Sequence, residues 1–346
     1  LLLYTNNQSH TNMKTIKIAF LLLFATTLNA QTPVPGGVKN KDIKVWLKAN
    51  GIVEKDSNNR VTKWKDNSGG NRDYYAPAPD KGKTPLFLRS VPIMNFNPSI
   101  FFNNKQDVTD YKNEKTEYLI INSGPMSSAS PMNHTSFAVY YAESDAFKKD
   151  EVYTHGFGAS DKPDGGTRFP SIGLHFEDDR NSAIGSGKVR NSGSGTSNLV
   201  GNRYLFKPFS TMIQVTHTTT GNASFYFNGT KETVRGDNNF GTKFRMNQGG
   251  TIGGVSSPTR SFIGNIAELI IYESELSEAE IIKVQTYLAL KYGVTLSTNY
   301  VLSNGVFDDV WPTLNPIYNP YSHNVAGIAR DDISGLLQKQ SRSSET

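Results

Sequence analysis

The sequence contains no cysteine among its 346 residues. This absence excludes thiol catalysis, disulfide cross-links and every metal site built on thiolates. A chain without disulfides must be stabilised by its own hydrophobic core, and this one is long enough to build one. We therefore expect packing and hydrogen bonding to account for the fold.

Other patterns that would assign a function are also missing. The sequence has no Gly-x-Ser-x-Gly elbow, no His-Glu-x-x-His pair and no phosphate-binding glycine loop. Its 36 basic and 31 acidic residues form no basic block, which excludes nucleic acid as a partner. No segment approaches the about 20 apolar residues that a transmembrane helix needs.

Residues 1–30 are expected to lie outside the mature protein. From Met13 the sequence has a basic start, an apolar stretch over 18–25 and a small residue at Ala30, which together are typical of a secretory signal peptide. Residues 1–12 precede the expected initiator. The alternative is a buried N-terminal helix. A signal peptide predicts a secreted protein.

What the sequence does have is a series of short strand signals. Aromatic and β-branched residues recur between Gly, Asn and Asp turns, which predicts an all-β fold. In the clearest hairpin, residues 212–217 are followed by a turn and return as 223–227. Asn228 and Gly229 then predict a type I′ turn. By contrast, the Gly- and Ser-rich segment 181–198 is expected to be a flexible loop.

The strongest signal is a strand followed by a helix. Residues 262–272 are almost all apolar, so this strand must be covered on both faces. Ser277 and Glu280 form a capping box, apolar residues then recur at helical spacing, and Gly293 provides a C-terminal cap. We predict a helix over 277–292 that covers the sheet.

These segments resemble the second half of a concanavalin A-like, laminin-G-like domain. The resemblance rests on an aromatic-x-aromatic-Asn-Gly hairpin, an Ile-Gly-Gly strand, a Phe-x-Gly-x-Ile-x-Glu strand and a Leu-Ser-x-x-Glu helix start, at residues 225–229, 251–254, 262–272 and 276–280. It implies a two-sheet antiparallel jelly-roll β-sandwich over 38–293, with one C-terminal packing helix. Residues 294–346 are expected to begin a second, truncated module.

A narrower resemblance covers most of the chain. Residues 45–49, 64–69, 95–98, 287–293 and 327–332 are similar to large surface proteins that Gram-negative bacteria export by the type IX route. The resemblance implies display on the bacterial surface, linkage to further modules of the same chain, and adhesion to an extracellular glycan or matrix component. Some jelly rolls of this superfamily are laminarinase-type glycoside hydrolases, which carry Glu-x-Asp-x-x-Glu on one strand. Here the last position of each Glu-x-Asp start holds another residue: Asn59, Lys148 or Ser182.

Candidate ligand-binding residues combine aromatic and polar groups, because a sugar stacks its apolar face and hydrogen-bonds through its hydroxyls. One candidate is the pair Tyr74 and Tyr75, which strand alternation could equally leave half buried. The other follows the Gly/Ser segment and consists of Asn202, Arg203 and Tyr204. Trp46 and Trp64 lie in strand-like segments and are expected in the core.

Calcium is the one candidate cofactor, since many related domains hold it at the rim of the sandwich through oxygen ligands. Asp66, or Asp178 with Asp179, would supply these oxygens. The alternatives are a turn residue that hydrogen-bonds its own backbone for Asp66, and a solvated charged turn for the pair.

The leading hypothesis is a non-catalytic surface binding module. A polysaccharide-degrading enzyme or its accessory domain, and a structural spacer, are the alternatives.

The helix start can be tested by mutation. Ser277→Ala removes the side chain that caps the helix, and we expect it to lower the free energy of unfolding by about 0.5–2 kcal/mol. Denaturant melts of the two proteins measure this difference. Equal midpoints would mean that the helix does not begin at Ser277.

Overall fold

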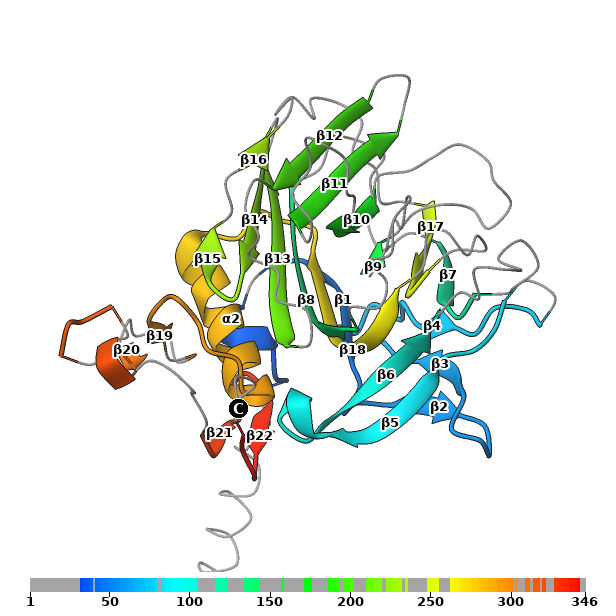
Figure 1. Cartoon of the computed structure of the whole chain (residues 1–346), viewed down its shortest axis with the longest axis horizontal. Helices are drawn as coiled ribbons and strands as arrows, with labels where there is room; N and C mark the ends of the chain where they lie inside the picture. The colour runs from blue at the N-terminus through cyan, green and yellow to red at the C-terminus, as the bar shows by residue number, and fades with distance from the viewer. Residues whose placement is uncertain are drawn as a thin grey trace, which may run out of the picture. The chain divides into compact units, whose positions relative to one another are not determined.

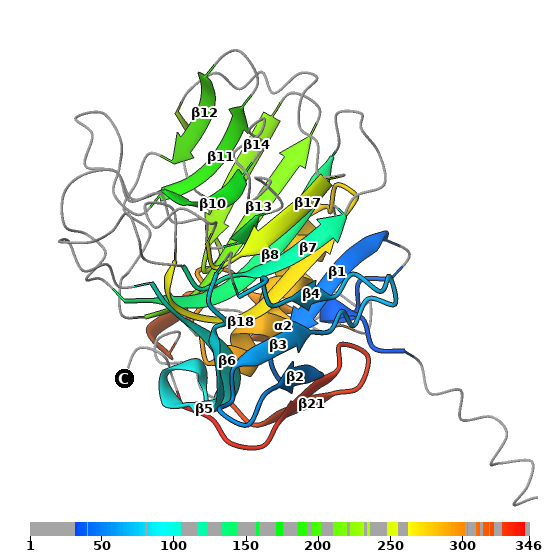
Figure 2. The same ribbon diagram turned by 90° about the vertical axis from the view of Figure 1, so that its right-hand side faces the viewer.

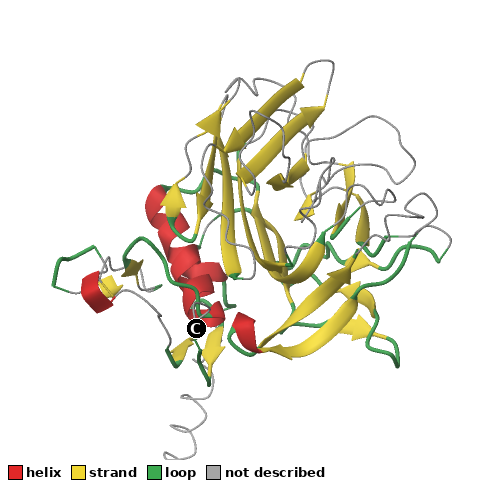
Figure 3. Ribbon diagram, in the orientation of Figure 1, coloured by secondary structure: helices red, strands yellow, loops and turns green. Residues whose placement is uncertain are grey.

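The computed structural model confirms an all-β sandwich with one long helix against a sheet (Figures 1 and 3). From Val34 onward the chain forms one compact unit. The structure describes residues 32–39, 41–79, 82–104, 116–123, 133–143, 157–158, 171–175, 186–192, 196–201, 210–219, 222–231, 234–235, 248–254, 262–301, 303, 309–311, 314–317, 319–321 and 327–342. The jelly-roll connectivity stays a prediction.

The first layer is an eight-stranded antiparallel sheet, which we call the main sheet. Its strands run in the order β15-β14-β13-β8-β18-β6-β5, and β1 also pairs with β18. Their bounds are β1 Ile43–Lys48, β5 Leu86–Val91, β6 Asn97–Asn103, β8 His134–Ala142, β13 Thr211–Thr219, β14 Asn222–Phe227, β15 Thr230–Lys231 and β18 Ile263–Tyr272. The expected hairpin is therefore confirmed as β13 and β14. Asn228 and Gly229, both at positive φ, close the following turn.

The second layer contains a six-stranded sheet, which we call the outer sheet, in the order β2-β3-β4-β7-β17-β9. Its strands are β2 Val53–Lys55, β3 Val61–Trp64, β4 Tyr74–Tyr75, β7 Leu119–Ser123, β17 Gln248–Ile252 and β9 Phe157–Gly158. Figure 2 shows strands of the two sheets in the turned view. Buried side chains of both sheets, including Trp64, Tyr74, Phe102 and Phe225, form the core between them.

The expectation of a flexible loop over 181–198 was wrong. A four-stranded sheet in the order β10-β11-β12-β16 contains most of this segment. Its strands are β10 Ser171–His175, β11 Ser186–Ser192, β12 Thr196–Gly201 and β16 Val234–Arg235. Gly and Ser have low strand propensity, but pairing with neighbouring strands supplies backbone hydrogen bonds that propensity does not count.

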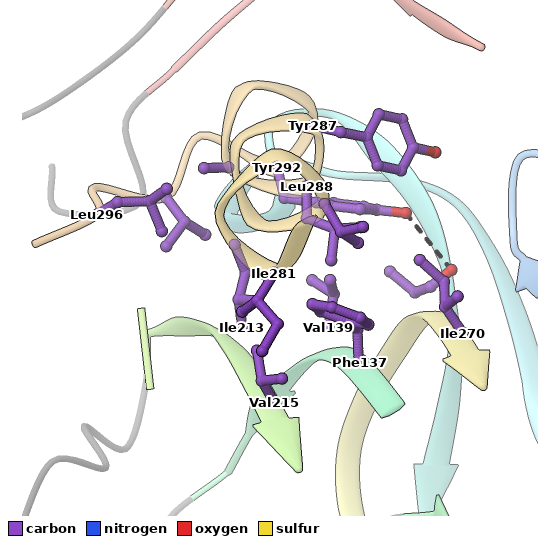
Figure 4. Close-up of a cluster of buried hydrophobic side chains, with 14 of the residues drawn as sticks. Phe137, Val139, Ile213, Val215, Ile270, Ile281, Tyr287, Leu288, Tyr292 and Leu296 are labelled. Carbon is purple, nitrogen blue, oxygen red and sulfur yellow. Dashed lines mark hydrogen bonds between the residues drawn. The ribbon is translucent and has the colours of Figure 1, made fainter. Parts of the chain in front are cut away.

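Helix α2, Glu278–Tyr292, covers the other face of the main sheet and confirms the predicted cap. Ser277 Oγ accepts from the backbone N–H of Glu280, the Glu280 carboxylate accepts from the N–H of Ser277, and Gly293 is left-handed at φ 67°. Ile281 and Leu288 point toward side chains of β8 and β13, and Tyr292 points toward β18 (Figure 4). Val284, Gln285 and Thr286 are buried as well, so the helix is covered on more than one side. No described helix is both long and apolar enough to cross a membrane.

Residues beyond Gly293 contribute short elements. These are β19 Tyr300–Val301, β20 Asp309–Trp311, β21 Ala329–Asp331, β22 Leu336–Gln338 and the 3-10 helix η4 Asn319–Tyr321; two earlier 3-10 helices are η1 Pro35–Gly37 and η2 Pro92–Met94. Gln338 Nε2 donates to the carbonyl of Asn95 at 3.0 Å, and the N–H of Val34 donates to the carbonyl of Ile333 at 3.0 Å. The hairpin of β21 and β22 is thus bonded to the sandwich. The domain boundary after Gly293 stays a prediction.

Candidate functional site

The two tyrosines that the sequence predicts as ligand-binding residues lie next to each other in strand β4 but point to opposite faces of the outer sheet. Adjacent residues of a strand point to opposite faces. Tyr74 lies in the core and is only 1% exposed, whereas Tyr75 is 45% exposed on the solvent face of the outer sheet. Burial raises the pKa of the Tyr74 hydroxyl. Of the pair, only Tyr75 can contact a ligand.

A polar row flanks Tyr75 on the same face. Glu54 of β2 pairs with Lys63 of β3, and Lys63 pairs with Tyr75. Lys63 Nζ donates to Glu54 Oε1 at 3.0 Å and lies 5.6 Å from the centroid of the Tyr75 ring. The hydrogen bond to Glu54 raises the pKa of Lys63. We call Glu54, Lys63 and Tyr75 the Tyr75 row; it presents one aromatic ring beside one cation and one anion.

Asp66 has the geometry of a turn residue. Its Oδ1 accepts from the N–H groups of Trp46 and Ser68, each at 2.9 Å, and its Oδ2 accepts from Ser68 Oγ at 2.6 Å and the N–H of Arg72 at 3.1 Å. Four protein donors thus occupy the carboxylate, which favours the turn interpretation over a calcium ligand. In the described ranges no three His, Asp or Glu side chains are grouped so that they could hold a metal.

The other predicted residues lie outside the described part of the chain. These are Asp178 and Asp179 for calcium, and Asn202, Arg203 and Tyr204 for a ligand. Trp46 and Trp64, in contrast, are described and buried, at 2% and 0% exposure. Their predicted place in the core is confirmed.

The structure contains a buried ion pair between α2 and the main sheet. The Glu268 and Lys291 side chains are 0% and 3% exposed, and Lys291 Nζ lies 2.6 Å from Glu268 Oε2. A bulge explains how Glu268 reaches this side: Ile266 pairs with Tyr140 and Glu268 with Val139, so Ala267 is one extra residue. Ala267 and Glu268 therefore both face the helix.

Every oxygen of Glu268 has a donor. Oε1 accepts from Trp46 Nε1 at 2.6 Å and Tyr287 OH at 2.9 Å, and Oε2 also accepts from Tyr292 OH at 2.8 Å. Burial lowers the pKa of Lys291, and Glu268 opposes that shift. Burial raises the pKa of both tyrosine hydroxyls. A carboxylate so enclosed holds the helix in place and cannot contact a substrate.

The sequence does indicate this ion pair. The signal is not the periodicity of the strand or of the helix but a charged residue within each apolar segment. Glu268 is the one charged residue in the apolar segment 262–272, and Lys291 stands between apolar residues near the helix end. A charge in a segment that must be buried requires a partner of opposite charge.

Glu117 is a second buried carboxylate and is also held by the protein. Its Oε1 accepts from Arg60 Nη1 at 2.8 Å, and its Oε2 accepts from the N–H of Asn103 at 2.7 Å. Burial raises the pKa of Glu117, and the bond to Asn103 and the charge of Arg60 oppose the rise. Its contacts join β6 to the segment before β7.

A cavity of about 310 Å³ lies between α2 and the C-terminal hairpin. Its lining is mainly apolar, with Lys283, Thr286, Ser303, Arg330 and Asp331 as the polar residues. Asp331 is engaged by its own turn, since its carboxylate accepts from the N–H of Ile333 and from Ser334 Oγ. Arg330 is likewise engaged, since its Nε donates to Asp332 Oδ1 at 2.9 Å, and we place no function in this cavity.

Comparison with known proteins gives one family match, over a minor part of the chain. Residues 280–346 match a domain of unknown function, DUF8202. The matched segment begins within α2 and therefore includes most of this helix. No curated protein matches the chain.

Several solved structures are distantly similar. Domain 4 of AbnA, a GH43 extracellular arabinanase from Geobacillus stearothermophilus solved with arabinotriose, is 14% identical with a TM-score of 0.47, over 71% of this chain and 98% of that one. The binding domain of Paraclostridial Mosquitocidal Protein 1 is 12% identical (TM-score 0.45; 75% and 54%). The botulinum neurotoxin serotype D binding domain is 10% identical (0.47; 75% and 53%). This chain thus spans about half of each toxin structure, and all three similarities are too distant to assign a ligand.

The buried ion pair yields a stability prediction. Lys291→Met leaves Glu268 charged and without its cation, and we expect this change to lower the free energy of unfolding by about 3–5 kcal/mol. Glu268→Gln combined with Lys291→Met removes both charges and should recover most of that loss. Lys65→Met, at a half-buried lysine outside this contact, serves as the control and should change stability by no more than about 0.5 kcal/mol.

Urea melts of five proteins measure these differences: wild type, Lys291→Met, Glu268→Gln, the double variant and the control. An additive double variant, as unstable as the sum of its two single changes, would contradict the coupling of Glu268 with Lys291.

Proposed function

We propose that this protein is a non-catalytic binding module that is displayed on a bacterial cell surface and attaches to an extracellular glycan or matrix component. The observation that carries the proposal is the 45% exposure of Tyr75 on a sheet whose other face is packed in the core. A strand of a folded domain can hold such a ring rigidly, which reduces the entropy lost on binding.

The Tyr75 row has the chemistry that a sugar requires. An aromatic ring offers a flat apolar surface, while charged groups beside it can hydrogen-bond the hydroxyls. Lys63 supplies N–H donors, and Glu54, held at 3.0 Å by Lys63, supplies acceptors. Because the row contains both charges, it suits a neutral or weakly charged glycan better than a strongly charged one.

The charges of the described residues favour binding over hydrolysis. Glycoside hydrolysis needs two carboxylates that reach the same bond, about 5–10 Å apart. Glu268 and Glu117 are enclosed by their own donors, and the Glu54 carboxylate is paired with Lys63. The experiment tests the proposal against three alternatives: a polysaccharide-degrading enzyme, an accessory domain of such an enzyme, and a structural spacer.

The location of the protein on the cell surface is part of the proposal. Residues 13–30 have the pattern of a secretory signal peptide, and the chain resembles type IX-exported surface proteins. Both features support export to the cell surface. The proposal includes a calcium ion, for which Asp178 and Asp179 would supply carboxylate ligands.

Glycan binding by residues 31–346 tests the proposal. We expect retention on a glycan array without release of reducing sugar. Tyr75→Ala should weaken binding about tenfold or more, because it removes the central aromatic contact. Tyr75→Phe keeps the ring and should bind within a few-fold of wild type. Ile317→Ala changes a 72% exposed apolar residue outside the Tyr75 row and should have no effect.

The array is run with calcium and again with a chelator. Loss of binding with the chelator would support the calcium ligands, and unchanged binding would remove calcium from the proposal. Turnover of a bound glycan would favour the enzyme. No binding under either condition would favour a spacer and contradict the proposal.

A further inference from the structure

The outer sheet exposes a second large apolar side chain besides Tyr75. Ile52 directly precedes β2 and is 57% exposed. Its carbonyl accepts from the N–H of Lys65 at 3.0 Å, so the ladder between β2 and β3 continues one residue past the pairing of Val53 with Trp64. Among the described residues before 300, Ile52 and Tyr75 are the only large hydrophobic side chains that are exposed.

The two exposed side chains lie on the same face of the outer sheet. Val53 and Tyr74 face the core between the two sheets. The residue next to each of them in the strand points to the opposite face. Ile52 and Tyr75 therefore both point to solvent, on the face that carries the Tyr75 row.

The separation of Ile52 from Tyr75 defines the length of this surface. Tyr75 pairs with Lys63, and Lys63 pairs with Glu54, which is two residues from Ile52. Two strand spacings are about 9–10 Å, and two residues along a strand are about 7 Å, so the two side chains are roughly 12 Å apart. One sugar ring cannot contact both of them. A chain of about three linked rings can, with its middle ring over Lys63 and Glu54.

The exposed part of the face has one closed end and one open end. Tyr75 pairs with Ile120, which is half-buried, and Ile120 pairs with Thr251, which is only 2% exposed. The face is thus covered toward β7 and β17. In the other direction the sheet ends, since β2 is its edge strand. A ligand on Tyr75 therefore has room to extend toward Ile52 and past the edge of the sheet.

The charges on this face cancel. Lys65 and Asp73 lie next to the core residues Trp64 and Tyr74 and join Lys63 and Glu54 on the solvent face. Lys63 Nζ lies 3.0 Å from Glu54 Oε1 and 4.0 Å from Asp73 Oδ2. Two lysines and two acids leave no net charge to attract an ionic ligand. Their N–H donors and carboxylate acceptors suit the hydroxyls of an uncharged chain.

We infer that Ile52 and Tyr75 are the two apolar contacts of one elongated site, and that its ligand is the interior of a linear, uncharged polysaccharide. We call Ile52, Glu54, Lys63 and Tyr75 the sheet platform. Tyr75 stacks on one sugar ring, Ile52 contacts a ring about two units further along, and Lys63 and Glu54 hydrogen-bond the hydroxyls between them. The inference rests on the proposed function and narrows its ligand class to a chain bound along its length, in contrast to a single terminal sugar.

The first test measures affinity against chain length. The probes are linear oligosaccharides of glucose, xylose, arabinose and mannose with one to six units, and calorimetry measures their Kd for residues 31–346. For at least one of these sugars, we expect the Kd to fall about tenfold or more between two units and four, because only the longer chain reaches Ile52. Further units should change the Kd little.

The second test removes the contact at Ile52. Ile52→Ser should weaken binding of the six-unit chain about fivefold or more and leave binding of the two-unit chain unchanged, because the short chain stays on Tyr75. Tyr75→Ala should weaken binding of both. Ile52→Leu keeps an apolar side chain and should bind like wild type. Ile317→Ser makes the same change at a 72% exposed isoleucine outside the platform and should have no effect. A Tm equal to that of wild type confirms that each variant is folded.

The results separate this inference from the proposed function. Equal Kd values for two and six units, with Ile52→Ser as tight as wild type and Tyr75→Ala impaired, would overturn the inference and leave the proposed function intact. Retention of only sialylated or sulfated glycans on the array would have the same meaning. No binding of any glycan in either assay would overturn both.

Discussion

The position of helix α2 depends on one buried ion pair. Glu268 and Lys291 join the sheet to the helix through a contact of 2.6 Å, and Trp46, Tyr287 and Tyr292 donate the remaining hydrogen bonds of the carboxylate. Such a pair need not add net stability compared with apolar residues of the same size. Its physical effect is specificity, since sliding the helix along the sheet would leave a charge buried without a partner. The bulge at Ala267 is what turns Glu268 to this side.

Helix α2 covers one face of the main sheet, and the other face packs in the core between the two sheets. The face of the outer sheet that points away from this core contacts solvent. The proposed site follows from this division. The Tyr75 row lies on the face of the outer sheet that the core between the layers does not use. Strand alternation produces this arrangement, since it buries Tyr74 beside an exposed Tyr75.

The sequence predicted the parts of the fold that local patterns determine. The capping box of α2, the β13–β14 hairpin and the buried strand β18 are each specified within a few residues of chain. The sequence could not predict which of Tyr74 and Tyr75 faces solvent. Strand alternation predicts that adjacent residues point to opposite faces, but not which of the two faces is buried. The Glu268–Lys291 pair joins residues whose contact depends on how the helix lies on the sheet. The strands β11 and β12 were missed because their Gly and Ser residues give no strand signal and pair through the backbone.

Hydrogen–deuterium exchange with and without a bound glycan tests most directly whether this sandwich binds glycan through its strands. It reports backbone protection along the whole chain, so it requires no prior choice of site. We predict increased protection in peptides that contain β3 and β4, with Lys63 and Tyr75. Protection confined to α2 and the hairpin of β21 and β22 would contradict this prediction and would place binding in the segment that matches the domain of unknown function.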